Sequence, residues 1–255
     1  MDWERQCAAV IPCFNEAHSI GEVVTSVRRH LPTVFVVDDG STDETANVAT
    51  NAGAEIIRLP HNTGKGAALR AGWRRALERG FAWALTLDGD GQHAPEDIPN
   101  FFSCAGKTGA ALVVGNRMDQ ASAMPWLRRQ VNCWMSRCLS RSLGVPLADS
   151  QCGFRLVNLK AAPLDRLATN HFEIESELLF AFLAAGCNVQ FAPVQVIYRS
   201  SPSKIHPLMD SWRWFRWWFG ARKKMAHFES TTAVRGYDHA ASKFPSPLNG
   251  ERDQG

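Results

Sequence analysis

The chain has 255 residues, of which 45% are hydrophobic and 21% are charged. This length and composition indicate one sizeable globular domain, with or without appendages. The formal net charge of +3 is too small to argue for nucleic-acid binding. No apolar run approaches the roughly 18 residues that cross a bilayer, so any membrane contact is expected from the surface.

Short apolar runs alternate with helix-like stretches in the first part of the chain. Strands are predicted at 7–12, 34–37, 54–59 and 81–87, and helices at 20–31, 43–53 and 67–79. Ser19 is predicted to cap the first helix in a capping box with Glu22. A strand so near the N-terminus leaves no room for a signal peptide. The βαβαβαβ order predicts an α/β fold, a mostly parallel sheet with helices on both faces.

The second part of the chain continues this alternation. The predicted elements are a strand at 110–115, a helix opened by Pro125 at 125–143, a polar loop at 149–155 leading into a short strand, a helix at 172–185 and a strand at 189–198. On the helix at 125–143 an apolar stripe includes Leu127 and Trp134, and the arginines lie largely away from it. Pro193 predicts that the last strand is an edge strand or a bulged one.

Residues 208–228 differ from the rest of the chain. Four tryptophans fall within seven residues, and arginines and lysines gather on one arc of a helical wheel. This pattern is typical of a helix that lies in a membrane interface. The alternative is a helix that covers the core and has one solvated face. The residues beyond it are rich in Ser, Pro, Gly and charges, so the predicted organisation is a domain at 1–207, an amphipathic helix at 208–228 and a disordered tail at 229–255.

The stretch 85–97 carries the strongest sign of chemistry. A predicted buried strand ends in two carboxylates one residue apart, Asp88 and Asp90, and the Gln92 amide follows. Alternate side chains of an extended chain share a face, so the three groups can converge on one point. Mg²⁺ takes one or two carboxylates and completes its shell with water and substrate phosphate oxygens. The alternative is a polar loop whose acids cap the helix that Pro95 opens.

Polar clusters also follow three other predicted strands, at the edge of the sheet where ligands bind in such folds. Asp39 is expected to accept a hydrogen bond from a base or a ribose. Lys65 lies near a predicted helix start and can sit beside an anion, although the P-loop pattern is absent. Arg117 and Lys204 are cations at predicted rim positions, and each alone also fits a solvated surface charge. His93 fits an ordinary loop histidine better than a ligand.

The seven cysteines are odd in number and contain no Cys-x-x-Cys pair. Cys7, Cys13 and Cys187 lie in or beside predicted strands, where a cysteine usually acts as a small buried hydrophobe. The cysteine pattern therefore argues for reduced thiols in a cytosolic setting, against a disulfide framework or a zinc site.

In their order and spacing these motifs resemble family 2 glycosyltransferases of the GT-A fold. Within that family the chain looks most like the dolichyl-phosphate mannose synthases and dolichyl-phosphate glucosyltransferases. The segments that carry the resemblance are 10–16 (VIPCFNE), 36–43 (VVDDGSTD), 62–67 (NTGKGA), 88–93 (DGDGQH), 149–155 (DSQCGFR) and 203–204 (SK). The resemblance runs from about residue 7 to residue 225.

The resemblance implies roles for individual residues. The residues implied to bind the nucleotide-sugar are Pro12, Phe14, Glu16, Asp38, Asp39, Lys65, Asp88, Gly89, Arg117 and Lys204. The residues implied to bind Mg²⁺ or Mn²⁺ are Asp88, Asp90 and Gln92, and those implied in catalysis are Asp90, Arg117 and Asp149. Phe14 stands where many relatives have tyrosine, so a hydroxyl contact is lost at that position.

The implied reaction is an inverting displacement at the anomeric carbon of a nucleotide-diphosphate sugar, of the GDP-mannose or UDP-glucose type. The expected acceptor is a polyprenyl phosphate, undecaprenyl or dolichyl, which is already anionic and needs no general base. A hydroxyl acceptor on a lipid or polysaccharide would need a carboxylate to take its proton. The candidates for that base are Asp149, Glu173 and Glu175.

The chain is expected to lack the C-terminal transmembrane helices of several relatives. The segment 208–228, with 125–143 as a second surface, is therefore expected to hold the protein peripherally on the inner, cytoplasmic face of the membrane. Two other classes of protein stay open. A nucleotidylyltransferase typically has a Gly-rich basic loop after its first strand, which 12–16 is not. A non-catalytic membrane adaptor would need only 208–228 and no metal ligands.

Overall fold

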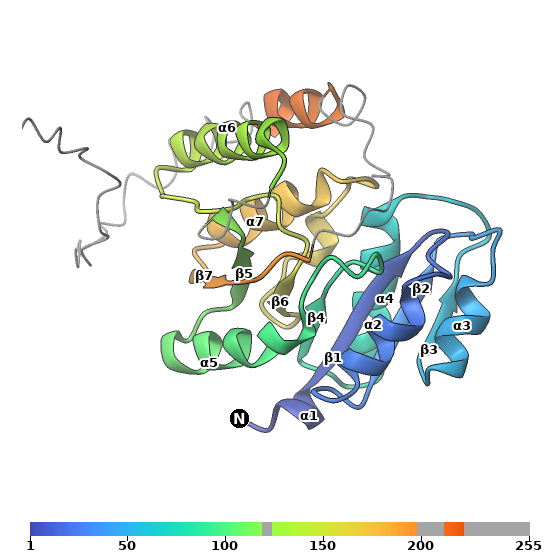
Figure 1. Cartoon of the computed structure of the whole chain (residues 1–255). Coiled ribbons are helices and arrows are strands. Elements are labelled where there is room, and N and C mark those ends of the chain that lie inside the picture. The colour runs from blue at the N-terminus through green and yellow to red at the C-terminus, as the bar shows by residue number, and fades with distance from the viewer. Residues whose placement is uncertain (119–123, 198–211, 222–255) are drawn as a thin grey trace, which may run out of the picture. The chain divides into compact units, whose positions relative to one another are not determined.

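The computed structural model describes residues 1–118, 124–197 and 212–221 (Figure 1). The chain divides into two compact units, Met1–Trp217 and Trp218–Gly255. The first unit carries the sheet and all the site residues described below. In the second unit, the described residues 218–221 are helical and continue a helical segment that starts at 212.

The centre of the first unit is a seven-stranded sheet in the order β3-β2-β1-β4-β6-β5-β7. The strands are β1 Cys7–Cys13, β2 Val34–Asp38, β3 Glu55–Arg58, β4 Trp83–Thr86, β5 Leu112–Asn116, β6 Arg155–Asn158 and β7 Val189–Pro193. β6 runs antiparallel to both of its neighbours, and every other pair is parallel. The predicted mostly parallel sheet is therefore confirmed, and β7 is an edge strand as its proline predicts.

Helices cover both faces of this sheet. They are α1 Trp3–Gln6, α2 Ile20–Val27, α3 Thr45–Asn51, α4 Lys65–Glu78, α5 Ile98–Thr108, α6 Trp126–Leu143 and α7 Ile174–Ala184, with 3₁₀ turns at Pro95–Asp97 and Leu164–Arg166. The chain steps outward from β1 to β2 and β3 and then returns past β1 to β4. Because such crossovers are right-handed, α4 lies on the other face of the sheet from α2 and α3 (Figure 1). The direction of the connections therefore reverses between β1 and β4, and ligands bind at the carboxyl ends of strands at such a point.

Several predicted details differ from the structure. β4 ends at Thr86 and β7 at Pro193, earlier than predicted, and α1 was not predicted. Ser19 is the N-cap residue of α2 but makes no side-chain cap bond. Its hydroxyl instead donates to the Gly89 carbonyl at 2.7 Å, so a contact distant in the sequence replaces the predicted capping box. None of the seven cysteines, which all lie in the described part of the chain, is in a disulfide.

The buried face of α6 coincides with only part of its predicted apolar stripe, namely Met135 and Leu139. The side chains that α6 buries are Asn132, Met135, Ser136 and Leu139. Leu127 and Trp134 are 65% and 41% exposed, and Trp126 is 72% exposed. Ser136 is buried because it bonds to Ser150 of the 149–155 loop, and the buried Asn132 amide donates to Met124 Sδ at 3.9 Å. The helix leaves large apolar groups on its outer side.

Of the predicted segment 208–228, only 212–221 is described, and it is helical. Trp214 is 2% exposed, and its indole N–H donates to Ser176 Oγ at 2.9 Å. Trp134 of α6 lies against Phe215, with ring centroids 5.0 Å apart. Part of the segment therefore covers the core, which was the alternative interpretation, while Trp212 is 60% exposed. The tail at 229–255 and Lys204 lie outside the described residues.

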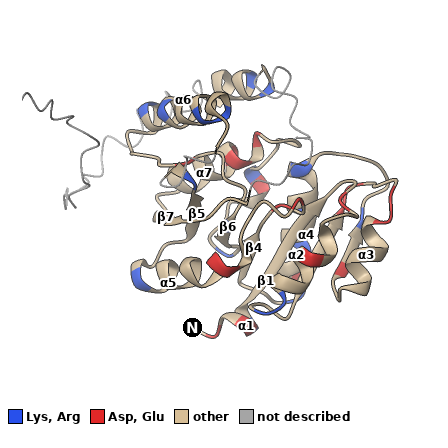
Figure 2. Cartoon of the chain, viewed as in Figure 1, with Lys and Arg blue, Asp and Glu red and all other residues tan. Residues whose placement is uncertain are grey.

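No helix in the described part of the chain is long and apolar enough to cross a membrane. Figure 2 shows basic positions along α6 and acidic positions in the loops that follow β2 and β4. The acidic positions are therefore concentrated at the carboxyl ends of the parallel strands, where the predicted site residues lie.

Candidate active site

The loops that follow β1 and β2 are bonded to each other. Asn15 Oδ1 accepts from the Thr42 amide at 2.8 Å, and the Asn15 amide donates to Ser41 Oγ at 2.9 Å. Asn15 has φ 54°, a left-handed conformation that asparagine adopts more readily than most residues. The predicted nucleoside-binding residues therefore lie on adjacent strand ends. They are Pro12, Phe14, Glu16, Asp38 and Asp39.

Asp39 positions a third loop at this edge. Its Oδ1 accepts from the amide and the hydroxyl of Thr63, both at 2.8 Å, and its Oδ2 accepts from the Gly64 amide at 2.7 Å. Asp39 is 4% exposed, whereas Pro12 and Phe14 are half-buried. Asp39 therefore holds the loop that precedes α4, and a nucleoside would use only its remaining lone pairs.

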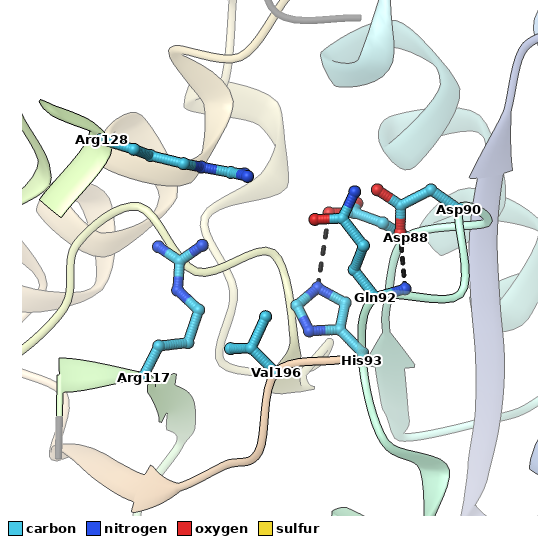
Figure 3. A pocket seen from close by; sticks show the side chains of 7 residues that line it. All are labelled: Asp88, Asp90, Gln92, His93, Arg117, Arg128 and Val196. Carbon is cyan, nitrogen blue, oxygen red and sulfur yellow. Dashed lines mark hydrogen bonds and ion pairs between the residues drawn. The ribbon is translucent and has the colours of Figure 1, made fainter. Parts of the chain in front are cut away.

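Asp88, Asp90 and Gln92 line one pocket, as predicted, but not from an extended strand (Figure 3). They lie in a turn after β4, which Gly91 allows with φ 71°. The Gln92 amide donates to Asp90 Oδ1 at 3.0 Å and closes this turn. A Cβ at Gly89 would lie 2.5 Å from Cys13 Sγ, so only glycine lets the turn approach β1 this closely.

These donors fit a hard divalent cation that shares its coordination with a substrate. Across the described residues, no group of three or more His, Cys, Asp or Glu side chains is arranged to hold a metal. A cage made only of protein side chains is thus absent from that part of the chain. Two carboxylates and one amide oxygen at a pocket suit Mg²⁺ or Mn²⁺, which accept water and phosphate oxygens for the remaining positions.

Lys65, at the start of α4, lies between two carboxylates. Its Nζ is 2.5 Å from Asp88 Oδ1 and 2.6 Å from Glu175 Oε1. Burial opposes the charge on Asp88, but the Lys65 ammonium and the His93 contact together outweigh burial and hold the pKa of Asp88 well below its usual range. Burial likewise opposes the charge on Lys65, and Asp88 and Glu175 outweigh it and raise the pKa of Lys65. Both groups are therefore charged at neutral pH.

His93 belongs to the site, which its sequence context did not indicate. It is 6% exposed, lines the pocket, and its Nε2 lies 3.4 Å from Asp88 Oδ2. Its ring packs on Phe154 with centroids 5.2 Å apart, and its backbone bridges to Val196. His93 thus contacts one carboxylate oxygen of Asp88 while Lys65 contacts the other, and only the tertiary contacts reveal this role.

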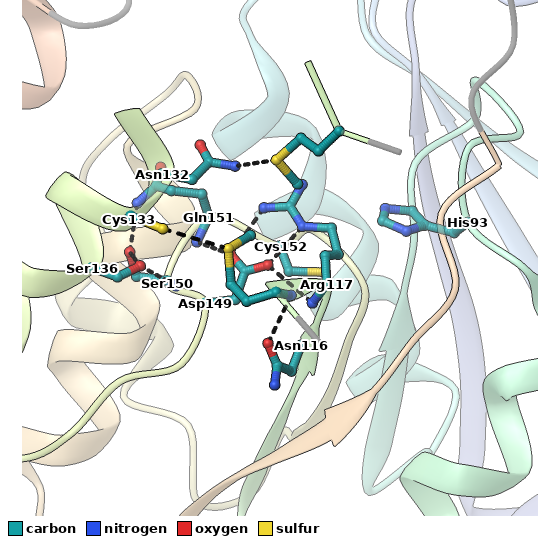
Figure 4. A network of polar contacts seen from close by, with 12 residues as sticks. His93, Asn116, Arg117, Asn132, Cys133, Ser136, Asp149, Ser150, Gln151 and Cys152 are labelled. Atoms are coloured by element: carbon teal, nitrogen blue, oxygen red, sulfur yellow. Dashed lines mark hydrogen bonds and ion pairs between the residues drawn. The ribbon is translucent and has the colours of Figure 1, made fainter. Parts of the chain in front are cut away.

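Arg117 and Asp149 form a buried bidentate ion pair (Figure 4). Arg117 Nε donates to Asp149 Oδ2 at 2.7 Å, and Nη2 donates to Oδ1 at 2.9 Å. Burial would raise the pKa of Asp149, but Arg117 outweighs burial and lowers it. A carboxylate with both oxygens engaged and a lowered pKa is a weak base. The geometry therefore fits Asp149 as the residue that positions Arg117 at the pocket.

Arg128, from the first turn of α6, lines the pocket on the same side as Arg117 (Figure 3). The sequence placed it only among the arginines on the polar side of a helix. Its position depends on how α6 docks. Ser136 Oγ, on the buried face of α6, accepts from the Ser150 amide at 3.0 Å, which ties α6 to the loop that carries Asp149.

The pocket therefore has two chemically different walls. One carries oxygen donors from the turn after β4, and the other carries the guanidinium groups of Arg117, which follows β5, and Arg128 of α6. The family model described as "Glycosyl transferase family 2" matches residues 8–154, which cover the loops after β1, β2 and β4. The chain belongs to glycosyltransferase family 2. The predicted resemblance is confirmed, and the matched residues include the polar loops at the carboxyl ends of the parallel strands β1, β2 and β4.

Relatives of this family 2 glycosyltransferase include enzymes named for lipid phosphates. The undecaprenyl-phosphate mannosyltransferase of Micrococcus luteus is 31% identical over 204 residues, which cover 74% of this chain and 83% of the relative. The polyprenol monophosphomannose synthase of Mycolicibacterium smegmatis is 30% identical over 205 residues, covering 74% of this chain and 77% of the relative.

A solved structure supports the predicted GT-A fold. It is glucosyl-3-phosphoglycerate synthase from Mycobacterium tuberculosis in complex with Mn²⁺, uridine diphosphate and phosphoglyceric acid. The TM-score is 0.59 at 20% sequence identity, and the match covers 83% of this chain and 75% of that one. At this identity the likeness shows the fold alone.

The structure separates the remaining candidate bases of this family 2 glycosyltransferase. Glu175 is engaged by Lys65. Glu173, the residue before α7, is 8% exposed, and its Oε2 is buried with no hydrogen-bond partner among the described residues. Neither residue lines the pocket that holds Asp88 and Asp90.

Proposed function

We propose that the protein transfers a sugar from a nucleotide-diphosphate sugar to a polyprenyl phosphate, with Mg²⁺ or Mn²⁺ bound by Asp88, Asp90 and Gln92. The observation that carries this proposal is the two-walled pocket. Oxygen donors on one wall suit a cation that bridges to the donor diphosphate. Arg117 and Arg128 on the other wall suit a second phosphate, because guanidinium groups pair with phosphate oxygens.

The state of the carboxylates favours a phosphate acceptor over a hydroxyl acceptor. Asp149 is tied to Arg117, and Asp88 and Glu175 are tied to Lys65. Asp90 is the proposed metal ligand, and Glu173 does not line the pocket. A hydroxyl nucleophile needs a free carboxylate to take its proton, whereas a phosphate monoester brings its own negative charge. The pocket offers guanidinium groups for that charge, and no base is required.

The donor would lie across the carboxyl ends of β1 and β2, with its diphosphate toward the Asp88–Gln92 turn. The residues proposed to hold it are Pro12, Phe14, Glu16, Asp38, Asp39 and Gly89. The metal, when bound, supplies Lewis-acid stabilisation of the negative charge that develops on the leaving diphosphate. Arg117, held rigid by Asp149, orients the incoming phosphate toward the anomeric carbon.

The protein is also proposed to work at the inner face of the cytoplasmic membrane. The acceptor is a lipid, and two relatives are named for lipid phosphates. Supporting this, α6 presents Trp126, Leu127 and Trp134 to solvent while its Arg128 lines the pocket. Tryptophan and leucine beside basic groups suit an anionic lipid surface.

The test is transfer from radiolabelled GDP-mannose, UDP-glucose or UDP-N-acetylglucosamine to undecaprenyl phosphate in the presence of Mn²⁺. We expect a labelled lipid from which mild acid releases the sugar, because a sugar linked through a phosphate is labile to mild acid. Asp90→Ala should reduce transfer by about a hundredfold or more, because it removes a metal ligand. Glu96→Ala, which removes an exposed carboxylate outside the pocket, is the matched control and should leave transfer intact.

Each other outcome of this assay has a definite meaning. Full transfer in excess EDTA, or by Asp90→Ala, contradicts the metal assignment. An acid-stable glycosidic product identifies a hydroxyl acceptor, and Glu173 then becomes the candidate base. No transfer and no release of UDP or GDP, with every donor and a lipid phosphate present, would favour the non-catalytic adaptor.

A further inference from the structure

Lys65 is enclosed by groups that fix its ammonium between Asp88 and Glu175. The Lys65 and Glu175 side chains are 13% and 6% exposed, whereas that of Asp88 is 31% exposed. The Phe172 ring lies 5.6 Å from Nζ, so the ammonium is covered on a further side. Lys65 therefore does not line the pocket itself and influences it through its contact with Asp88.

The 149–155 loop leaves space for this ion pair. A Cβ at Gly153 would lie 2.9 Å from Lys65 Nζ and 2.9 Å from Asp88 Oδ2. Any side chain at Gly153 would press on both partners at once. The backbone at Gly153 thus packs directly against the Lys65–Asp88 ion pair, so the fold itself keeps the two side chains together.

We propose that Lys65, held by Glu175, is an internal cation that competes with the divalent metal for Asp88. The inference rests on the proposed function, because it concerns the metal bound there. While Lys65 neutralises Asp88, the pocket attracts a free metal ion weakly. The phosphate oxygens of a nucleoside diphosphate restore the missing negative charge, so metal and nucleotide bind together. Lys65 is thus a positioning residue that prevents stable loading of metal alone.

The electrostatics give opposite signs for two variants. In Glu175→Gln, Lys65 keeps only Asp88 as a charged partner, and the pocket becomes more positive. Mn²⁺ affinity without nucleotide should then fall about tenfold, since neighbouring unit charges interact by more than a kcal/mol in a partly buried site. In the double variant Lys65→Met/Glu175→Gln, Asp88 loses its cation, and Glu175, which Lys65 also pairs, is neutralised together with it. Mn²⁺ affinity without nucleotide should then rise by about the same factor.

The readout is the electron paramagnetic resonance signal of free Mn²⁺, titrated with and without UDP or GDP. The matched control is Glu177→Gln, which makes the same charge change on α7. The Glu177 carboxylate accepts from the Ala168 and Thr169 amides and has no ion pair among the described residues. Thermal unfolding of each variant, followed by circular dichroism, ensures that only folded protein is compared.

The titrations separate the inference from the proposed function. If the wild-type protein binds no Mn²⁺ even with UDP or GDP, the proposed metal site is wrong. If the wild type binds Mn²⁺ with nucleotide, but both variants have the wild-type Mn²⁺ affinity without nucleotide, the proposed competition by Lys65 does not occur. Tighter Mn²⁺ binding by Glu175→Gln would also overturn the inference. The inference is supported if Mn²⁺ affinity without nucleotide falls in Glu175→Gln and rises in the double variant. In the double variant, UDP or GDP should also increase Mn²⁺ affinity much less than it does in the wild type.

Discussion

Replacing Asp149 by asparagine tests how strongly the fold depends on the ion pair with Arg117. Asp149 is fully buried and Arg117 is 6% exposed. Besides the two side-chain bonds, the Arg117 amide donates to Asp149 Oδ2 at 3.3 Å and the Gln151 amide to Oδ1 at 3.1 Å. Asparagine keeps one acceptor, but its NH₂ group would face a guanidinium that also only donates.

The expected cost at neutral pH is about 3 kcal/mol, because removing one partner of a buried pair leaves an uncompensated charge. For a chain of this size that corresponds to a fall in melting temperature of about 10 °C. Urea unfolding at pH 7, followed by tryptophan fluorescence, measures the free energy directly. Asp165→Asn, an exposed carboxylate in a 3₁₀ turn, is the control and should change stability very little.

The pH dependence of this loss has a defined sign. The pKa of Asp149 is lowered in the folded protein, so its ionisation stabilises the fold above the unfolded-state pKa of about 3.9. That stabilisation is lost as the pH falls through the lower pKa of the folded state. The difference between wild type and Asp149→Asn should therefore be constant from pH 7 to about 5 and shrink below about 4. A loss under 1 kcal/mol at pH 7, or a difference that grows as the pH falls, would refute the reasoning.

Two further changes test the packing of α4 and the outer face of α6. A Cβ at Gly72 would lie 2.3 Å from Val10 Cγ1, so Gly72→Ala should destabilise the fold by about 1–3 kcal/mol in urea unfolding. A Cβ at Gly106 meets no atom within 4 Å, so Gly106→Ala should stabilise α5 by up to about 1 kcal/mol. If Gly72→Ala and Gly106→Ala changed the free energy of unfolding equally, the packing argument would be contradicted. Trp126→Ser should weaken sedimentation with anionic liposomes about tenfold, and Leu77→Ser, an exposed site on α4, should not. Unchanged sedimentation of Trp126→Ser would remove α6 from the membrane contact.

The fold was predictable because the central strands are buried on both faces. β1, β2 and β4 read as continuous apolar runs, which is the pattern of a parallel sheet covered by helices. The order of strands and helices then limits the topology through the right-handed crossover rule. The face that α6 buries could not be predicted in the same way. Asn132 and Ser136 are polar, and they are buried because they bond to Met124 and Ser150, which lie outside the helix.

In the site, too, local sequence features were predictable and tertiary contacts were not. Asp88, Asp90 and Gln92 were predictable together because they are neighbours in the sequence and form one turn. The contacts that control them come from other elements: Ser19 to Gly89, and Lys65 to Asp88. No local pattern specifies which of several cations and carboxylates will pair across a fold. Lys65, which the sequence placed beside an anion, thus pairs with two carboxylates in the structure.

The charge distribution in the pocket also explains why Asp90 is the informative residue to change. Of the two carboxylates that line the pocket, Asp88 is shared with Lys65 and contacts His93, whereas Asp90 has no ion pair among the described residues. An approaching divalent cation would therefore meet its least neutralised ligand at Asp90. Asp88 can contribute fully only when another negative group offsets Lys65, and the donor diphosphate is such a group. If Lys65 competes for Asp88 as proposed, the metal would be held firmly only when the sugar donor is present, which would match the requirement of the transfer reaction.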